Sequence, residues 1–264
     1  MSNNKVAVLS LSGGMDSTSL MLHLLEKKYS VHAISFIYGQ KHQVEINLAK
    51  NNILYLKRNG FNKMLNHKVF DLSNIFLDLK SSLLDEEKVP EGHYESKSML
   101  STFVPNRNAI FFSILFAHAI SLAKKGDSEI KISMGAHGGD HAIYPDCRDD
   151  FFIDLFNVSK KGNWDSDNIS LYMPYIKMNK SDILEDSIKN IDKMNLDFNK
   201  IYKNTITSYS PDIGGISSGK TGSDIERILA FNKLNLIDPI KYQETWDIVL
   251  KNAKKIEEEY NNKK

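Results

Sequence analysis

A stretch near the N-terminus combines the residue types that hold a phosphate chain. Residues 6–9 form a short apolar run typical of a buried strand, and helical spacing of apolar side chains begins at Ser19. The glycines between these segments can adopt backbone angles closed to other residues and let a ligand approach the main chain. Free N–H groups at the start of the helix and the loop hydroxyls then face an anion. We therefore predict a phosphate site at Ser12, Gly13, Gly14, Met15, Asp16, Ser17 and Thr18.

Asp16 distinguishes this loop from the common mononucleotide loop, G-x-x-x-x-G-K-[ST], in which a lysine reaches the outer phosphates. Here an acid stands beside the phosphate site instead. A carboxylate suits a Mg²⁺ ion that bridges phosphate oxygens, because this ion binds a few carboxylates together with phosphate and water. The alternative is a Gly/Ser turn that only begins a helix, with Asp16 in the first turn. The strand, the full hexad and the helix in register favour the nucleotide site.

Alternating segments predict the architecture that positions this loop. Strands are expected at residues 31–37, 69–72 and 130–134, and helices at 43–57, 109–124 and 149–160. This alternation is typical of parallel βαβ units, so we predict an α/β fold with a doubly wound, mostly parallel sheet. Residues 73–102 break the pattern and are expected to form a surface insertion or flap. We expect an α/β domain at 1–200 and a C-terminal lid with helices at 201–264.

Polar side chains gather where the predicted strands end, which is where ligands bind on such sheets. The asparagine and arginine at 106–108 either cap a helix or contact a ligand. A helix cap is expected at Asn179, and Lys180 beside it either reaches phosphate or is solvated. The His and Asp residues of the 135–148 loop have no helical i, i+4 spacing, which disfavours a metal site. Cys147 is either a nucleophile or, more in keeping with a small buried thiol, a packing residue.

Bulk properties exclude several classes of protein. The 264-residue chain has a formal net charge of +1, so no global field argues for nucleic acid or membrane binding. A single cysteine excludes an intramolecular disulfide. Neither a signal peptide nor a membrane-spanning apolar run is present, so we expect a cytoplasmic protein.

The motifs together resemble a known enzyme family. SGGMDS resembles the pyrophosphate loop of the N-type ATP pyrophosphatases, whose fold is of the adenine nucleotide alpha hydrolase type. With YGQKH and Glu45 after it, FVPNRN, G-x-H-x-x-D followed by YPDCR, and residues 174–180, the chain resembles the 7-cyano-7-deazaguanine synthases from Val6 to Phe231.

This resemblance implies an ATP-dependent reaction on a deazapurine. The carboxylate of 7-carboxy-7-deazaguanine is adenylated, ammonia displaces AMP to give an amide, and a second activation yields the nitrile. Such an enzyme works by positioning and by neutralising phosphate charge. The implied ligands are ATP, Mg²⁺, the deazaguanine acid and ammonia, without nucleic acid, in a homodimer.

The expected site residues fall into three groups. Catalysis is expected from Asp16, Lys180, Asp146 and Arg148, with Asp16 holding Mg²⁺ through ATP. ATP is expected to contact the phosphate loop and Tyr38, Gln40, Lys41 and His42. The substrate is expected to contact Arg107, Asn108, His137, Asp140, Tyr144, Asp146 and Arg148. An arginine fork suits a carboxylate, and an aspartate suits a ring N–H and amino group.

One departure from the family concerns zinc. The family carries four zinc cysteines near its C-terminus, and this chain has Ser208, Ser218, Thr221 and Asp224 at those positions. Neutral hydroxyls are poor zinc ligands, so we expect no zinc. Because a structural zinc contributes folding free energy, hydrogen bonds or subunit contacts must replace it.

Alternative interpretations remain. Residues 214–221 formally match G-x-x-x-x-G-K-T, but no buried strand precedes them, so a lid or turn is favoured over a second nucleotide site. The reaction could stop at the amide, or the activated acyl group could pass to another amine. A non-catalytic nucleotide-binding homologue is also open, although Asp16 in a complete loop argues against it.

Overall fold

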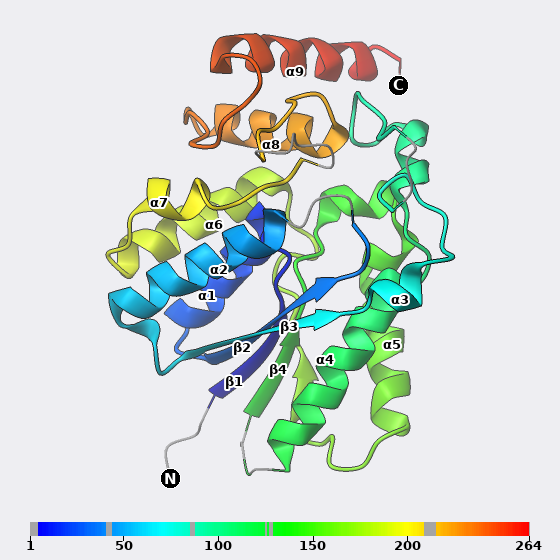
Figure 1. Cartoon of the computed structure of the whole chain (residues 1–264), viewed down its shortest axis with the longest axis vertical. Helices are drawn as coiled ribbons and strands as arrows, with labels where there is room; N and C mark the ends of the chain where they lie inside the picture. Colours follow the sequence, from blue (N-terminus) through cyan, green and yellow to red (C-terminus); the bar gives the residue numbers. More distant parts are fainter. Residues whose placement is uncertain are drawn as a thin grey trace.

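The computed structural model describes residues 5–40, 44–84, 88–124, 126, 129–208 and 215–263. Its centre is a parallel sheet of β1 (Lys5–Ser10), β2 (Ser30–Ile37), β3 (Leu65–Asp71), β4 (Glu129–Ser133) and β5 (Ile169–Leu171). The strand order is β3-β2-β1-β4-β5 (Figure 1). The predicted doubly wound parallel sheet is therefore confirmed.

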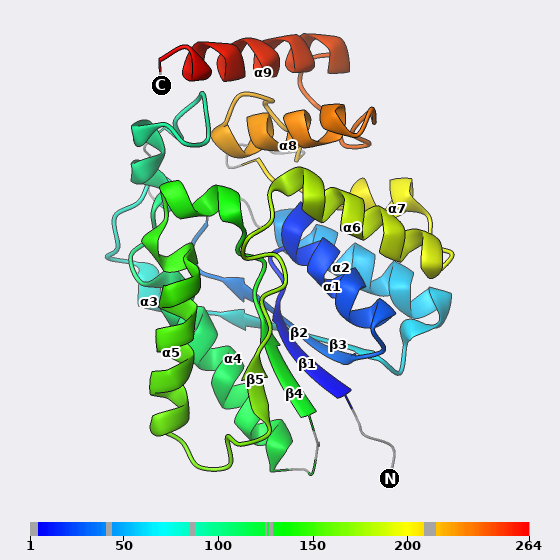
Figure 2. The same ribbon diagram turned by 180° about the vertical axis from the view of Figure 1, so that it is seen from behind.

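Helices cover both faces of this sheet. One face carries α1 (Met15–Glu26), α2 (Val44–Leu56), α6 (Lys180–Lys193) and α7 (Phe198–Tyr202), as Figures 1 and 2 show. The other carries α4 (Arg107–Ala123) and α5 (Asp149–Lys161). Alternate β1 side chains enter the two cores: Ala7 and Leu9 pack in one, Val6 and Val8 in the other. Burial on both faces explains why residues 6–9 of the central strand β1 form a continuous apolar run.

Some elements differ from the sequence prediction by more than one residue or were not predicted. Strand β3 starts at Leu65 rather than at residue 69, and the three-residue β5 was not predicted. Helix α4 begins at Arg107, and Asn106 before it has φ 60° and makes no side-chain cap hydrogen bond. The helix-cap interpretation of Asn106 is therefore wrong, because this residue instead makes the left-handed turn that asparagine tolerates.

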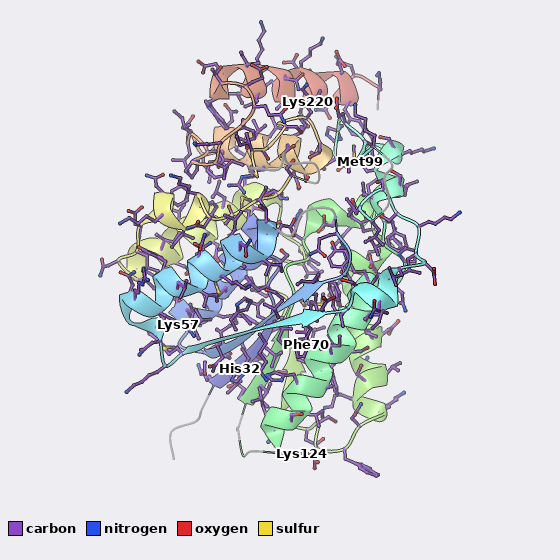
Figure 3. All side chains as sticks on the ribbon, viewed as in Figure 1. His32, Lys57, Phe70, Met99, Lys124 and Lys220 are labelled. Carbon is purple, nitrogen blue, oxygen red and sulfur yellow. The ribbon has the colours of Figure 1, made fainter. Side chains whose placement is uncertain are left out.

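The described residues of the 73–102 insertion are largely irregular, with α3 (Ser73–Phe76) and η2 (Lys97–Thr102) at its ends. Its second half lies beside α8 (Gly222–Lys233) and α9 (Trp246–Asn261), which stack beyond the carboxyl end of the sheet (Figure 1). Figure 3 shows Met99 and Lys220 together at this end and Lys124 at the opposite one. No helix in the described part of the chain is long and apolar enough to cross a membrane.

Candidate active site

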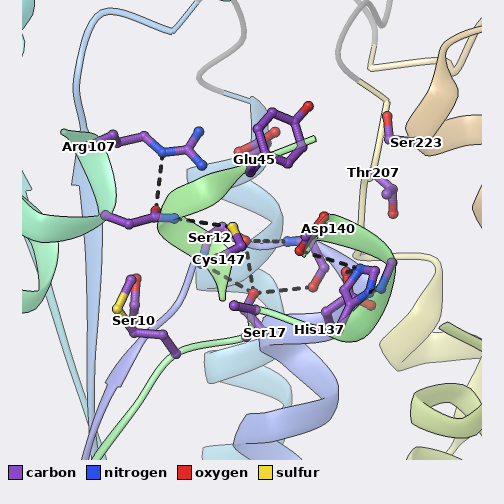
Figure 4. A pocket seen from close by; sticks show the side chains of 18 of the residues that line it. Ser10, Ser12, Ser17, Glu45, Arg107, His137, Asp140, Cys147, Thr207 and Ser223 are labelled. Carbon is purple, nitrogen blue, oxygen red and sulfur yellow. Dashed lines mark hydrogen bonds and ion pairs between the residues drawn. The ribbon is translucent and has the colours of Figure 1, made fainter. Parts of the chain in front are cut away.

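A cavity of about 240 Å³ opens where β1, β2 and β4 end (Figure 4). Most predicted site residues converge there. The lining includes Ser12, Gly14, Asp16, Ser17, Tyr38, Gln40, Arg107, Asn108, His137, Asp140, Tyr144 and Lys180. These side chains come from segments far apart in the sequence, so the parallel sheet is what assembles them.

The phosphate loop is held in shape by its own hydrogen bonds. Ser12 Oγ lies 2.9 Å from Ser17 Oγ and accepts the Gly14 N–H at 3.2 Å, while the Ser12 N–H donates to Ser17 Oγ at 3.2 Å. Helix α1 follows with Gly14 as N-cap and no side-chain cap, so its first N–H groups are available to an anion.

Gly13 is required by packing. Its φ is +95°, and a Cβ there would overlap the carbonyl oxygen of Glu45. This glycine lets the loop lie against the start of α2, and it does not line the cavity. The sequence indicated a glycine that lets a ligand approach the main chain. In the structure, Gly13 instead allows the close approach of the Glu45 backbone.

A cluster of charged side chains lies beside this loop. Lys180 is the first residue of α6, positioned by a capping box in which Asn179 Oδ1 accepts the N–H groups of Ser181 and Asp182. Lys180 Nζ lies 3.3 Å from Asp16 Oδ2 and 2.7 Å from Glu226 Oε2, with its side chain 5% exposed. The solvated interpretation of this lysine is therefore wrong.

His137 completes the cluster. Its Nδ1 accepts the Gly139 N–H at 3.1 Å, so Nε2 carries the proton toward the carboxylates. Nε2 lies 3.6 Å from Asp140, 3.8 Å from Asp16 and 3.9 Å from Glu226. Burial opposes protonation of His137, but these three carboxylates outweigh it and raise its pKa.

The pKa values of Asp16 and Lys180 shift in opposite directions. Burial works against ionisation of Asp16, yet Lys180 and His137 hold its pKa below the ordinary value. Burial likewise works against the charged amine of Lys180, but Asp16 and Glu226 raise its pKa. Both groups are therefore ionised at neutral pH, as phosphate and cation binding require.

Asp16 fits a divalent cation. Its second oxygen, Oδ1, is buried without a hydrogen-bond partner. A buried carboxylate oxygen left unpaired is costly, and a cation that also binds phosphate oxygens would satisfy it. Among the described residues no three His, Cys, Asp or Glu side chains form a metal-binding group, so phosphate and water would have to supply the other ligands.

The far side of the cavity is aromatic, with Arg107 and Glu45 at its edge (Figure 4). Phe36 and Phe111 stack with centroids 4.1 Å apart, and Arg107 Nη1 donates to Tyr38 Oη at 3.5 Å. Burial raises the pKa of Glu45 to about 7, although Arg107 opposes the shift. This end can enclose a flat heterocycle and pair with its carboxylate or ring N–H groups.

Several predicted residues lie elsewhere. Met15 and Thr18 are buried and do not line the cavity, and Lys41 and His42 fall outside the described residues. Asp146 and Arg148 do not line the cavity either. Arg148 is exposed and its Nε donates to the carbonyl of His141 at 3.2 Å.

Asn108 has a structural task. Its amide donates to the carbonyl of Asp146 at 3.1 Å and to Cys147 Sγ at 3.4 Å, and its oxygen accepts a hydrogen bond from Arg107 Nε at 3.4 Å.

Cys147 is buried, and burial raises the pKa of its thiol well above the ordinary value. A protonated, packed thiol fits the packing interpretation of this cysteine better than the nucleophile.

Of the four positions at which the resembled family carries zinc cysteines, Ser208, Ser218 and Thr221 surround the carboxylate at the fourth, Asp224. Asp224 is fully buried, and its oxygens accept hydrogen bonds from Ser208, Ser217, Ser218 and Thr221 hydroxyls at 2.8–3.1 Å. The Thr221 N–H donates to it as well, at 3.2 Å. Thr221 is the N-cap of α8, and its hydroxyl accepts the Asp224 N–H. Lys220, the lysine of the formal G-x-x-x-x-G-K-T match at residues 214–221, is exposed.

Some cavity residues were not predicted. Tyr94 and Met99 arrive from the insertion, and Thr207, Ser223 and Glu226 from the C-terminal region. Glu226 sits in an amphipathic helix, where a glutamate is ordinarily solvated, so spacing alone gave no signal for it. Its location depends on how α8 packs.

A family model and individual relatives match this chain over most of its length. The family model for "Queuosine biosynthesis protein QueC" matches residues 6–235. "7-cyano-7-deazaguanine synthase 1" of Colwellia psychrerythraea is 41% identical over 240 residues, covering 90% of this chain and 99% of that protein. "7-cyano-7-deazaguanine synthase" of Pseudoalteromonas translucida is 40% identical over 242 residues, covering 90% and 99%. The solved NMN synthetase of Francisella tularensis aligns with 96% of this chain and 87% of its own at 10% identity, with a TM-score of 0.41.

Proposed function

The chain belongs to the QueC family of queuosine biosynthesis proteins, and on that premise we propose that it converts 7-carboxy-7-deazaguanine and ammonia to 7-cyano-7-deazaguanine with ATP. The observation that carries the proposal is the meeting of Asp16 and Lys180 at the phosphate loop, inside a cavity whose other end holds Arg107. Phosphate groups and an organic acid can therefore bind within one enclosure.

A carboxylate is a poor electrophile, so AMP must be attached to give it a leaving group. The N–H groups at the start of α1 and the Lys180 amine would bind the pyrophosphate portion of ATP. Arg107, held by Asn108 and Tyr38, would orient the acid toward the α-phosphate. Catalysis would then come from alignment and from neutralised phosphate charge.

Asp16 would hold a Mg²⁺ ion through its unpartnered Oδ1, and the ion would neutralise phosphate charge. His137 Nε2–H, 3.8 Å from Asp16 and 3.6 Å from Asp140, would help to hold these carboxylates in position. The flap residues Tyr94 and Met99 would keep water from the activated acid, which hydrolysis would otherwise consume.

Product analysis tests the proposal directly. The purified protein, incubated with 7-carboxy-7-deazaguanine, ATP, Mg²⁺ and ammonium, should yield the nitrile, AMP and pyrophosphate by mass spectrometry. An amide that accumulates without nitrile would mean that the reaction stops after one activation. ATP turnover without a modified deazaguanine would contradict the assigned substrate.

A further inference from the structure

Glu226 is a charged group in the cavity that the reaction described above does not use. It lies on α8, its side chain is 12% exposed, and Oε2 is 2.7 Å from Lys180 Nζ. Its other oxygen, Oε1, packs so closely on Gly139 that a Cβ there would overlap it. The fold thus makes room for this carboxylate beside the phosphate loop.

The effect of Glu226 follows from the charges around it. Asp16, Asp140 and Glu226 are three carboxylates, and Lys180 and His137 are the cations facing them. The cluster is net negative with His137 protonated, and more so with His137 neutral. The adjacent Arg227 adds no net charge because Asp238 pairs with it through two hydrogen bonds of 2.6 and 2.9 Å.

A net negative cluster repels a triphosphate that has no bound metal ion, and it attracts a cation. Glu226 also shares the Lys180 amine with Asp16, because Nζ lies between the two carboxylates at 2.7 and 3.3 Å. Without Glu226 the amine would pair with Asp16 alone. The Asp16 carboxylate would then be less available to a metal ion.

We propose that Glu226 makes nucleotide binding depend on a divalent cation, by keeping the site negative and the Asp16 carboxylate available. This inference rests on the proposed function of the site. It assigns α8 a part in the ATP step and makes Glu226 a positioning residue that acts through Lys180 and Asp16.

The test is a pair of binding measurements on the full-length protein with α,β-methylene-ATP, which cannot be cleaved between its α and β phosphates. Calorimetry in EDTA gives the affinity for the metal-free nucleotide, and Mn²⁺ paramagnetic resonance gives metal binding with the nucleotide present. Glu226→Gln keeps the side-chain size and removes the charge. The matched control is Glu185→Gln, which removes the carboxylate from an exposed ion pair with Lys189 of 2.8 Å.

The two affinities should move in opposite directions in Glu226→Gln. Metal-free nucleotide should bind tighter and Mn²⁺ weaker, each on the order of tenfold, because one elementary charge a few ångström away is removed. Glu185→Gln and the charge-retaining Glu226→Asp should stay near wild type. Structural damage would instead weaken both ligands together.

The proposal is overturned if Glu226→Gln leaves both affinities unchanged or lowers both. Should that variant fail to fold, Glu226→Ser, which introduces a smaller neutral polar residue, must show the same opposite shifts or the proposal is wrong. Wild-type protein that binds no nucleotide with or without Mn²⁺ overturns the proposed function as well, so the two failures are distinguishable.

Discussion

At the residue scale, the two carboxylate oxygens of Asp16 have different surroundings. Its Oδ2 faces Lys180, while Oδ1 is buried without a partner. Asp16→Asn preserves size and helix position but removes the charge that a cation requires. We expect the variant to fold and to lose pyrophosphate release by at least about a hundredfold, a typical loss for a missing electrostatic group.

A coupled pyrophosphate assay at saturating ATP checks this expectation. Asp192→Asn, on the exposed end of α6, is the control and should retain full activity. Normal turnover by Asp16→Asn would place the phosphate site elsewhere.

Glu45 provides a pH-dependent prediction. Its pKa is raised to about 7 in the folded protein from an ordinary 4.5, so the neutral form is favoured on folding. Stability from this group is complete below pH 4.5 and is lost as pH rises through 7. Glu45→Gln should therefore change stability little at pH 4.5 and increase it at pH 8 by about 1–2 kcal/mol, allowing for partial exposure. Urea unfolding at both pH values tests this, and an equal effect at both would contradict the shift.

At the scale of elements, the N-terminal end of α8 is held by Asp224, which occupies one of the four positions where the resembled family carries a zinc cysteine. Asp224 is the third residue of α8 and collects four hydroxyl groups and a backbone N–H. A carboxylate at this position also complements the positive end of the helix dipole. Hydrogen bonds from loop and helix therefore converge on one charge.

Asp224→Asn should destabilise the protein by about 2–4 kcal/mol, because charge-assisted hydrogen bonds are lost in a buried place. Asp182→Asn is the matched control: Asp182 holds the same capping-box position on α6 without such a cluster and should cost only about 1 kcal/mol. Denaturant melts of both variants compare the two. Equal losses would show that only the helix cap matters.

The same arrangement predicts insensitivity to chelators. The protein should contain no stoichiometric zinc by elemental analysis, and its melting temperature should not change in excess EDTA. Relatives with four cysteines should lose stability, because metal binding is coupled to folding there. One tightly held zinc per chain would contradict the Asp224 arrangement.

At the scale of the whole molecule, the insertion and α8 cover the cavity, and α9 packs against α8. His93 is buried and stacks between Tyr260 at 3.7 Å and Tyr94 at 4.2 Å. Its Nδ1 accepts the Glu95 N–H, so Nε2–H donates to Glu257 at 2.8 Å. The Gly92 N–H also donates to the carbonyl of Lys220 at 3.0 Å. The C-terminal helix thereby fixes the flap whose Tyr94 lines the site.

Tyr260→Ala should loosen the contact between α9 and the insertion without affecting the sheet. We expect faster hydrogen exchange over residues 88–102, unchanged protection of β1 and β4, and KM values raised several-fold for both ATP and the acid, because ligand enclosure weakens. Lys254→Ala, on the exposed face of α9, is the control. Unchanged exchange in the flap would mean that the flap is held independently of α9.

The sequence by itself determined the parallel sheet and the strand, glycine turn and helix start around Asp16. These depend on neighbours in the chain: an apolar run, two glycines, Asp16 and a helix start follow one another within a few residues. Local geometry then places Asp16 in the first turn of α1, beside N–H groups that can bind an anion, wherever the rest of the chain goes. For the same reason Asn179 could be assigned as a helix cap and was confirmed.

Only the tertiary structure decided which carboxylates share the cavity. Asp146 follows a strand end as predicted, but it does not line the cavity, whereas Glu45 and Glu226 do. Glu226 reaches Lys180 because α8 packs over α6, and Asp224 gathers its hydroxyls because the 205–208 segment folds back beside α8. Contacts between segments far apart in the chain depend on packing, and local spacing alone did not reveal those of Glu226 and Asp224.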